Sequence, residues 1–334
     1  MSKKMVKILS ICLALTLVAV IAGCGGQKPS PQQAAPGAEV SFPNKAITII
    51  CPWSVDDVSD ALARSLGKSM EEILKQSVVV NNITGDSGAT GHGAGLHAVN
   101  DGYMVTMITF ELLSLPQQNL IPFTYKDFDL LAMVNMDAAA LTVSQNAPYN
   151  TLAEFIAYAK ANPGAINIGN YGPGSAWHIA GGMFGKAADI QMNFVPFSSS
   201  VPAITELVNG HIQAISVSAV EVRSQVEAGT LKILGVMSDE RLPNFLNVPT
   251  FKEQGVDVSF GTWRGFAVPK GTPESVKSVL VDAIQKGMEN PEFQNFAQKN
   301  GFGLVFMPPD EFGAFLDAES VSIAETMKDI GITI

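Results

Sequence analysis

Apolar runs of strand length alternate with segments of helical period along the first part of the chain. The predicted strands cover residues 46–51, 77–81 and 103–109, and the predicted helices between them cover residues 57–74 and 87–99. This β-α-β-α-β order is typical of a parallel sheet with right-handed crossovers, because parallel neighbouring strands need a connection about as long as a helix. We therefore predict an α/β unit in this region.

The same alternation recurs in the middle of the chain and predicts a second α/β unit. A C-terminal region with two long amphipathic helices and one short strand follows it. The predicted helices of these regions cover residues 151–162, 175–188, 201–209, 273–289 and 310–330, and the predicted strands cover residues 166–169, 192–197, 212–217 and 304–307.

Two strand-like segments that end in prolines, residues 139–148 and 261–273, connect the two units. A chain that leaves an α/β domain and returns to it has two linking strands, and such a pair forms a hinge beside a cleft. We therefore predict an α/β fold of two doubly wound domains with a ligand cleft between them. Domain I is expected to contain residues 42–141 and 264–334, and domain II residues 142–263.

The N-terminal segment is predicted to direct the protein out of the cytoplasm. Three lysines precede an uncharged apolar run at residues 8–22, which is shorter than the ~20 residues of a membrane-spanning helix. We therefore predict a signal peptide at residues 1–23. The small residues before Cys24 resemble a bacterial lipobox and predict a lipoprotein, with palmitate among its lipids, anchored to the cell membrane. The alternative is an ordinary cleaved signal with an incidental cysteine.

Composition narrows the possible partners. Residues 24–41 are rich in Gly, Pro, Gln and Ala and are predicted to be a flexible tether. The formal net charge of −10 excludes nucleic acid as a partner, and 47% apolar residues allow a large core.

If Cys12 leaves with the signal and Cys24 carries lipid, Cys51 has no partner for an intramolecular disulfide. The scattered histidines predict no metal site, and we expect no cofactor and a monomer.

Two glycine-rich turns at predicted strand-to-helix junctions are candidate binding loops. One contains Gly85, Gly88 and Gly91, and the other reads "GNYGPGSAWH" at residues 169–178. Glycines permit close backbone approach, and the N–H groups at a helix start bind small anions. Ligands of open parallel sheets collect at the C-terminal ends of strands, so the loops predict a ligand groove. The three tryptophans, at positions 53, 177 and 263, fall at predicted cleft or hinge positions and favour such a groove.

An enzyme from another class is the alternative function. Ser175 and His178 lie three residues apart and would share one helical face, which would suit a secreted α/β hydrolase. However, the segment lacks the last glycine of a nucleophile elbow, and helix capping by Ser175 explains the serine more simply. We therefore predict that the protein is not an enzyme.

The order of several segments resembles the substrate-binding proteins of tripartite tricarboxylate transporters, the Bug family. They include "FPNKAITIICPW", "SDALARSLGKSM", "VVVNNITGDSGATG", "VPFSSSVPAITELVNGHI" and "TWRGFAVPKGTPESV", and the resemblance extends over residues 42–334. It implies a type II periplasmic-binding-protein fold that closes around a small ligand, usually a carboxylate, and delivers it to integral membrane transporter subunits. Backbone amides of the first loop and of the second-domain glycine-serine loop hold the ligand carboxylate in this family.

Carried over by position, the resemblance implies a set of ligand-binding residues from four segments. They are Trp53, Ser54, Val55, Asp56, Asp57, Ser59 and Asp60; Gly88, Ala89 and Thr90; Tyr171, Gly174, Ser175 and Ala176; and Phe197 and Ser198.

The first of these loops departs from the family pattern, because it has no glycine and carries Asp56 and Asp57. Two interpretations stay open. Ser54 as N-cap with Asp57 three residues on would form a capping box, and acids there complement the helix dipole. Alternatively, an aspartate faces the cleft and pairs with a cationic group, so that the ligand bears an amine. We assign Asp57 to capping and keep Asp56 as the ligand candidate.

Overall fold

The computed structural model describes residues 42–55 and 57–332 of the protein. The predicted signal peptide, the lipidation site Cys24, the tether and Asp56 lie outside the described residues. Within that part of the chain, no helix combines the length and the apolar character needed to cross a membrane.

Three strands near the N-terminus form a parallel group, as predicted. The central strand β1 (Ile47–Cys51) pairs in parallel with β2 (Val78–Asn82) on one side and with β3 (Met104–Thr109) on the other. The intervening helices are α2 (Val58–Leu74) and α3 (Ala89–Leu96), and a 3-10 turn η1 (Asp86–Gly88) precedes α3. The alternation of apolar runs and helical periods therefore identified these elements to within a few residues.

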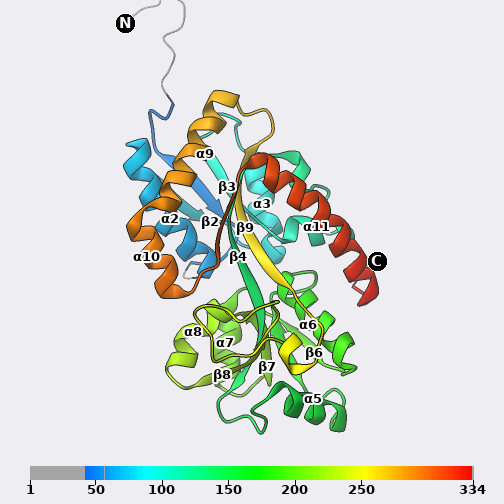
Figure 1. Ribbon diagram of the computed structural model, residues 1–334. Helices are drawn as coiled ribbons and strands as arrows, with labels where there is room; N and C mark the ends of the chain where they lie inside the picture. Colours follow the sequence, from blue (N-terminus) through cyan, green and yellow to red (C-terminus); the bar gives the residue numbers. More distant parts are fainter. Residues whose placement is uncertain (1–41, 56, 333–334) are drawn as a thin grey trace, which may run out of the picture. The chain divides into compact units, whose positions relative to one another are not determined.

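Two long strands run antiparallel through the centre of the molecule (Figure 1). They are β4 (Phe128–Ser144) and β9 (Gly261–Pro269), and they contain the first parts of the two segments predicted to connect the units, residues 139–144 and 261–269. Because β9 pairs antiparallel with β3 as well as with β4, the whole sheet is mixed, and the predicted parallel arrangement holds for the group β2–β1–β3. The short strand β10 (Leu304–Met307) also pairs antiparallel with β4.

Strand β4 passes from one group of partners to another between Ala138 and Ala139. Up to Ala138 it pairs with β9, and from Ala139 it pairs with β7 on one side. We call β1, β2, β3, β9, β10 and the first part of β4 half-sheet A, and the end of β4 with β5–β8 half-sheet B. The strands of half-sheet B are β5 (Asn167–Asn170), β6 (Asn193–Pro196), β7 (Ala214–Ser218) and β8 (Leu231–Val236).

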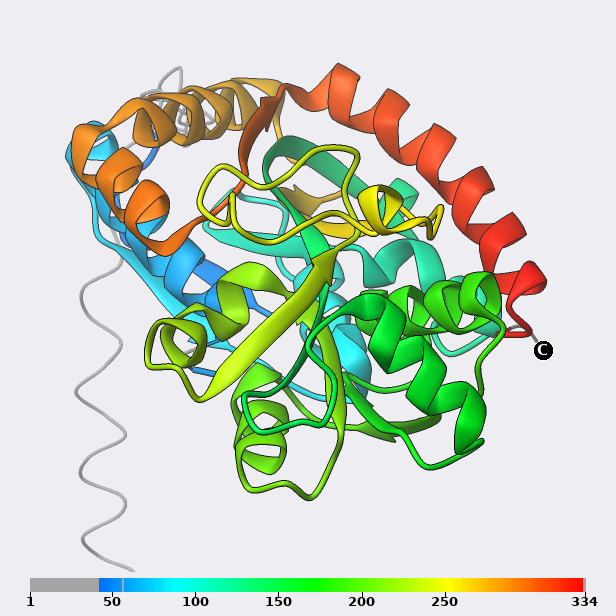
Figure 2. The same cartoon turned by 60° about the horizontal axis from the view of Figure 1, so that its bottom comes forward.

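Helices cover both faces of half-sheet A and surround half-sheet B (Figures 1 and 2). On half-sheet A, α2, α9 and α10 pack together on one side, and α3, α4 and α11 lie on the other. The further helices are α4 (Glu111–Ser114), α5 (Leu152–Ala161), α6 (Ala176–Ala188), α7 (Ser200–Val208), α8 (Ala219–Glu227), α9 (Glu274–Glu289), α10 (Pro291–Asn300) and α11 (Pro309–Asp329), with 3-10 turns η2 (Pro116–Gln118), η3 (Tyr125–Asp127) and η4 (Lys252–Gln254).

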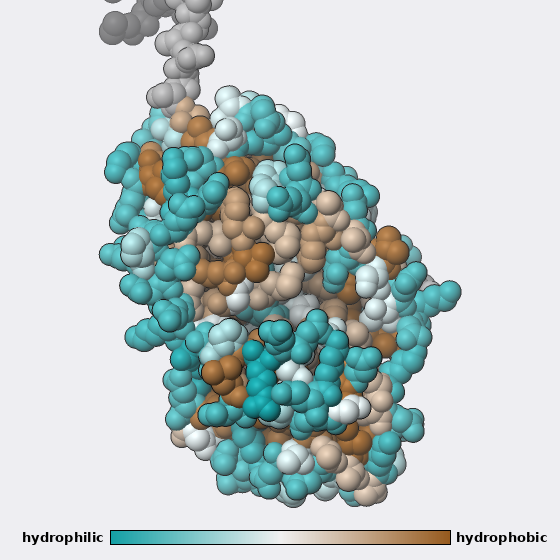
Figure 3. Space-filling view, in the orientation of Figure 1, coloured by the Kyte–Doolittle hydropathy of each residue, from teal (hydrophilic) through white to brown (hydrophobic). Residues whose placement is uncertain are grey.

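This arrangement is the α/β periplasmic-binding-protein fold that was predicted. The division into domains I and II at the stated boundaries stays a prediction. Helices α8 and α10 and strand β8 were not assigned from the sequence, and each of them is short. Most of one surface is polar, with apolar side chains gathered toward its middle (Figure 3).

The cysteine of the described residues, Cys51, ends β1 and is a buried free thiol. Burial raises the pKa of the Cys51 thiol to about 12. A thiol that stays protonated in an apolar environment is inert, so Cys51 acts as a core residue.

Candidate ligand-binding site

The first helix of the site begins at Asp57. This residue has extended backbone angles, and its Oδ1 accepts a hydrogen bond of 2.9 Å from the backbone N–H of Ser59. Asp57 is therefore the N-cap of α2, and the predicted capping box with Ser54 as N-cap is wrong, because the helix begins three residues later. The other oxygen, Oδ2, accepts from Ser200 Oγ of α7 at 3.4 Å. Asp57 thus caps a helix next to half-sheet A and also reaches a helix of half-sheet B.

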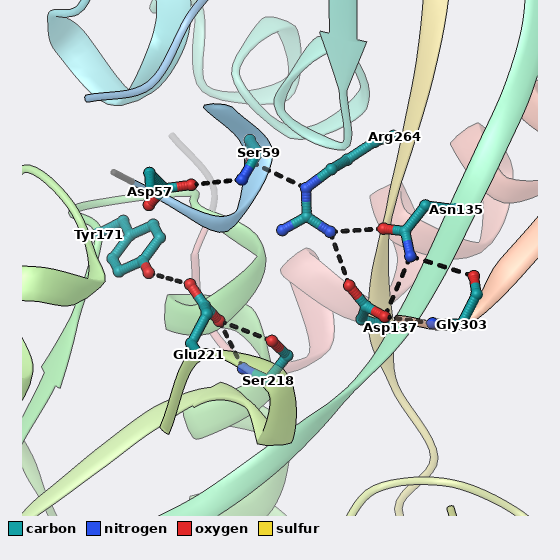
Figure 4. A network of polar contacts seen from close by, with 9 residues as sticks. All are labelled: Asp57, Ser59, Asn135, Asp137, Tyr171, Ser218, Glu221, Arg264 and Gly303. Atoms are coloured by element: carbon teal, nitrogen blue, oxygen red, sulfur yellow. Dashed lines mark hydrogen bonds and ion pairs between the residues drawn. The ribbon is translucent and has the colours of Figure 1, made fainter. Parts of the chain in front are cut away.

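Arg264 of β9 lies at the centre of a buried polar network (Figure 4). Its Nε donates to Ser59 Oγ at 2.8 Å, and its Nη1 donates to Asn135 Oδ1 at 2.6 Å and to Asp137 Oδ2 at 2.8 Å. Among the described residues, its second terminal nitrogen, Nη2, has no hydrogen-bond partner. Figure 4 shows this nitrogen pointing into the space bordered by Asp57, Tyr171 and Glu221.

The partners of Arg264 are themselves held in place by the turn before β10. Asp137 Oδ1 accepts a hydrogen bond of 3.0 Å from the backbone N–H of Gly303. Asn135 Nδ2 donates to the Gly303 carbonyl at 3.0 Å and to Asp137 Oδ1 at 3.1 Å. Both side chains come from β4, so the network fixes the guanidinium between the two long strands.

Glu221 lies in the first turn of α8. Its Oε2 accepts from the backbone N–H of Ser218 at 2.7 Å and from Ser218 Oγ at 2.9 Å, and its Oε1 accepts a hydrogen bond from the Tyr171 hydroxyl. Burial raises the pKa of Glu221 to about 7, and the nearby carboxylate of Asp57 adds to the rise. Desolvation disfavours the charged form, and a like charge in the same buried space disfavours it further.

Glu111 follows β3 and supplies a third buried carboxylate. Its Oε2 accepts from Thr109 Oγ1 at 2.5 Å, and its Oε1 accepts from the backbone N–H of Ala176 at 3.3 Å. Burial raises the pKa of Glu111 above its ordinary value. Because Ala176 is the first residue of α6, a carboxylate of the protein occupies the helix N-terminus at which an anionic ligand was expected.

A small cavity lies beside Arg264 and Glu111. Its volume is about 10 Å³, which is room for a single water. The ring centroids of Trp53 and Tyr171 are 5.6 Å apart, and those of Tyr171 and Trp177 are 6.3 Å apart. The described arrangement is therefore closed. The cavity is lined by Trp53, Ser59, Thr109, Glu111, Tyr171, Ala176, Trp177, Thr262 and Arg264.

Some of the predicted site residues are brought together here. Trp53, Ser59, Tyr171 and Ala176 line the cavity, and Asp57 belongs to the surrounding network. Their roles as ligand-binding residues stay predictions.

Other residues of the predicted first loop lie away from the cavity lining. Ser54 is half-buried before the helix, and Val55 is exposed. Asp60 is buried but is directed to a different set of partners, since its Oδ1 accepts from Asn82 Nδ2 at 2.7 Å and its carboxylate pairs with Arg64.

Residues of the remaining predicted segments have supporting positions. Gly88 lies behind Trp53, since a Cβ on it would be 3.5 Å from Trp53 Cζ2. Ser175 is the N-cap of α6. The other residues are half-buried Ala89, exposed Thr90, buried Gly174 beside Gln118, half-buried Phe197 beside Gly169, and exposed Ser198.

Trp263 is not a wall of the cavity, although the sequence placed it with the other two tryptophans. Its ring is buried and packs edge-on against Phe312 with centroids 5.4 Å apart. Side chains of a strand alternate between its faces, so Trp263 and Arg264 point in opposite directions. The indole therefore lies in the core while the guanidinium reaches the site.

Sequence reasoning missed Glu111, Glu221 and Arg264. Each of the three had a usable signal. Glu111 and Glu221 follow the C-terminal ends of strands, where ligands of α/β sheets bind. The signal for Arg264 was a charge within the otherwise uncharged strand Gly261–Pro269. A charge in such a strand is buried, and a buried charge needs partners.

The geometry does not form a Ser-His pair for a hydrolase. Ser175 Oγ accepts from the backbone N–H of His178 at 3.2 Å, as a helix cap does. The imidazole Nδ1 accepts from the backbone N–H of Gly174 at 3.2 Å, and the ring packs on Phe194. Burial lowers the pKa of His178 to about 4. Capping explains Ser175, as the sequence predicted.

Two half-sheets joined by long antiparallel strands, with a closed cavity of polar and aromatic side chains between them, define the class of periplasmic binding proteins. The chain belongs to the tripartite tricarboxylate transporter receptor family, whose sequence profile matches residues 62–332. The resemblance seen in the sequence is confirmed. Members of this family are extracytoplasmic binding proteins, so the chain is a solute-binding protein and not an enzyme.

Individual relatives agree with this assignment. A UPF0065 protein from the tcbD–tcbE intergenic region of Pseudomonas sp. strain P51 is 29% identical over 287 residues, which is 84% of each chain. A ligand-free TctC solute-binding protein from Polaromonas is 35% identical with a TM-score of 0.67, over 86% of this chain and 100% of that one.

Two further solved structures share the fold. The periplasmic binding protein BugD is 26% identical with a TM-score of 0.83, over 87% of this chain and 99% of that one. R. palustris Rpa4515, solved with adipate, is 22% identical with a TM-score of 0.84 over the same shares.

Proposed function

We propose that this protein captures a small metabolite bearing both a carboxylate and a protonated amine, and presents it to the membrane subunits of a tripartite tricarboxylate-type transporter. The observation that carries the proposal is the set of charges around one closed cavity. The buried guanidinium of Arg264 and the buried carboxylate of Glu111 line that cavity. The buried carboxylates of Asp57 and Glu221 lie close enough for the charge of Arg264 to act on them.

The charge balance supports an amine on the ligand. Arg264 forms its ion pair with Asp137, and no described basic side chain pairs with Asp57, Glu111 or Glu221. A ligand with two or three carboxylates would add negative charge to a space that already holds three acids. A protonated amine supplies the missing positive charge, and aromatic faces such as those of Trp53 and Tyr171 favour cations as well.

The carboxylate part of the ligand has a partner in Arg264 Nη2. A guanidinium binds carboxylates with directed hydrogen bonds, and this one is already oriented by Ser59, Asn135 and Asp137. The family name and the adipate held by R. palustris Rpa4515 also support a carboxylate ligand. Because the N-terminus of α6 is occupied by Glu111, the guanidinium replaces the backbone amides expected from the family.

Capture requires the two half-sheets to separate and close again. The cavity holds no more than a water, so a larger ligand enters only from a more open arrangement. Contacts such as the 3.1 Å hydrogen bond from Ser87 Oγ to the Tyr171 carbonyl link the two sides in the closed form. A ligand that touches both sides shifts the population toward closure.

A screen of matched ligands tests this function. We expect α-amino acids to raise the melting temperature with increasing concentration, and hydroxy acids of the same carbon skeleton to have a much smaller effect, because only a folded state that binds the ligand is stabilised. Differential scanning fluorimetry at pH 8 measures the shifts, with citrate and adipate in the same panel. Stabilisation by citrate equal to or greater than that by every amino acid would contradict the amine-bearing ligand.

Anchoring by lipid is the second part of the proposal, and it rests on Cys24 after the apolar run. We expect the full-length protein to be found in the membrane fraction and the Cys24→Ala chain to lose its lipid and leave that fraction. A lipid chain contributes about 0.8 kcal/mol of membrane binding per buried methylene, so the redistribution should be nearly complete. Equal membrane retention of both chains, with no lipid on Cys24 by mass spectrometry, would rule out this part.

A further inference from the structure

We infer that the amine of the ligand lies between Asp57 and Glu221 and takes the place of a proton held by these two carboxylates in the empty cleft. This inference rests on the proposed function, and it adds a defined ammonium subsite and a dependence of affinity on pH.

The two carboxylates approach the same space from opposite sides. Asp57 caps α2, which packs on β1 and β2 of half-sheet A, and Glu221 lies in α8, which packs on β8 and β7 of half-sheet B. Figure 4 shows both next to Tyr171 and facing the free nitrogen of Arg264. A cation between them would contact both half-sheets at once.

Both carboxylates retain acceptor capacity for such a cation. An ionised carboxylate offers about four lone-pair sites. Asp57 uses two, toward Ser59 and Ser200, and Glu221 uses three, toward Tyr171 and twice toward Ser218. A primary ammonium has three N–H donors and can bond to both groups.

Arg264 is a second and independent sign of a ligand in this space. The side chain is almost fully buried, yet among the described residues its Nη2 has no partner. Arg264 lines the small cavity, so an acceptor on a ligand could bond to this nitrogen. The guanidinium cannot move to Glu221 without giving up Asp137, so the space between the two acids is left for another cation.

The empty cleft holds a proton because several acids share a low-dielectric space. Burial raises the pKa of Glu221 to about 7, and it raises the pKa of Asp57 as well. Two carboxylates that interact this strongly titrate as a pair. The charged and titratable groups that act on the pair are Tyr171 of the β5–α6 loop and Arg264 of β9, and Arg264 in turn interacts with Asp137 of β4 and Glu111 of α4. The positive charge of Arg264 favours ionisation of the pair, and burial and the repulsion between the two acids oppose it.

The sign of the pH effect follows from this exchange. An ammonium binds when the pair is ionised, so binding releases a proton below about pH 7. The apparent Kd should therefore rise by about tenfold for each unit that the pH falls below this value, and level off above it. Without ligand, the stability of the folded state depends on pH with the opposite sign. The folded state holds a proton that the unfolded chain has lost, so stability declines as the pH rises through 7.

Methylammonium chloride is the probe that tests the subsite, because it presents the amine without a carboxylate. Titrations followed by melting temperature at pH 5.5 and pH 8, with sodium chloride as the salt control, should show binding that is about tenfold or more weaker at pH 5.5. In Glu221→Gln we expect weaker binding at pH 8 and little change between the two pH values. Glu227→Gln, on the exposed end of the same helix, should behave like the unchanged protein.

Equal affinity at the two pH values, or no binding at either, would overturn the inference. If Glu221→Gln does not fold, Asp57→Asn provides the same test from the other side of the cleft, and a pH dependence that survives there would also refute it. The proposed function can fail while the ammonium subsite stands. If methylammonium binds as expected while no amino acid does, the ammonium subsite stands and the carboxylate-bearing ligand is wrong.

Discussion

Replacing Arg264 by methionine is expected to lower the free energy of unfolding by about 3–5 kcal/mol. The guanidinium forms an ion pair of 2.8 Å with Asp137, and both side chains are about 5% exposed or less. Methionine fills much of the volume but leaves the carboxylate buried without a positive partner, and the cost of an unpaired buried charge exceeds the value of the pair itself. Urea denaturation followed by circular dichroism measures the loss.

Two comparisons make this result specific. Arg241→Met removes an exposed pair with Glu253 and should change stability little. Adding Asp137→Asn to Arg264→Met should recover part of the loss, because the neutral amide no longer carries the desolvation cost of a charge. If Arg264→Met were as mild as Arg241→Met, Arg264 would not hold the network together. Binding of amino acids should also weaken, because the carboxylate loses its cationic partner.

Gly303→Ala is expected to destabilise the protein by about 1–3 kcal/mol or more. A Cβ at this position would lie 2.1 Å from the carbonyl oxygen of Met136 in β4, a backbone atom that cannot rotate away. The turn would have to shift, and the hydrogen bonds that it makes with Asn135 and Asp137 would lengthen or break. Thermal unfolding with calorimetry or circular dichroism checks the expected loss.

Gly313→Ala is the matched control for this substitution. Gly313 lies inside α11, and a Cβ there meets only Leu130 Cδ1 at 3.7 Å, an ordinary contact. Alanine in a helix interior is favoured over glycine by about 0.5–1 kcal/mol, so this variant should be neutral or more stable. Similar losses in both variants would mean that the close approach to Met136 is not the cause.

Much of the fold was predictable because its signals are local. The parallel group β2–β1–β3 appears as three apolar runs separated by helical periods, and each run needs only its neighbours in the sequence to be recognised. The antiparallel insertion of β9 between β3 and β4 was not predictable in this way. Strand pairing over more than a hundred residues leaves no trace in periodicity, so the mixed sheet became visible only in the structure.

The site was predictable in part. The family resemblance implied Trp53, Ser59, Tyr171 and Ala176, and these line the cavity, while their roles in binding stay predictions. Asp57 caps α2, as its assignment to capping predicted, and its other carboxylate oxygen accepts from Ser200. The pairing of an aspartate of this loop with a ligand amine stays a prediction. The error about Ser54 came from placing the helix start three residues too early, and boundaries depend on cap geometry that a sequence does not display.

By itself, the sequence determined the alternation of strands and helices, the family and the class of protein, since apolar periodicity and ordered motifs are properties of neighbouring residues. Only the tertiary structure decided the chemistry of the cleft. Asp57, Glu111, Glu221 and Arg264 are separated by up to about two hundred residues along the chain, and all four are buried, with the charge of Arg264 acting on the three acids. The charge state of each group depends on how closely the others approach and how little water lies between them, and both are set by folding.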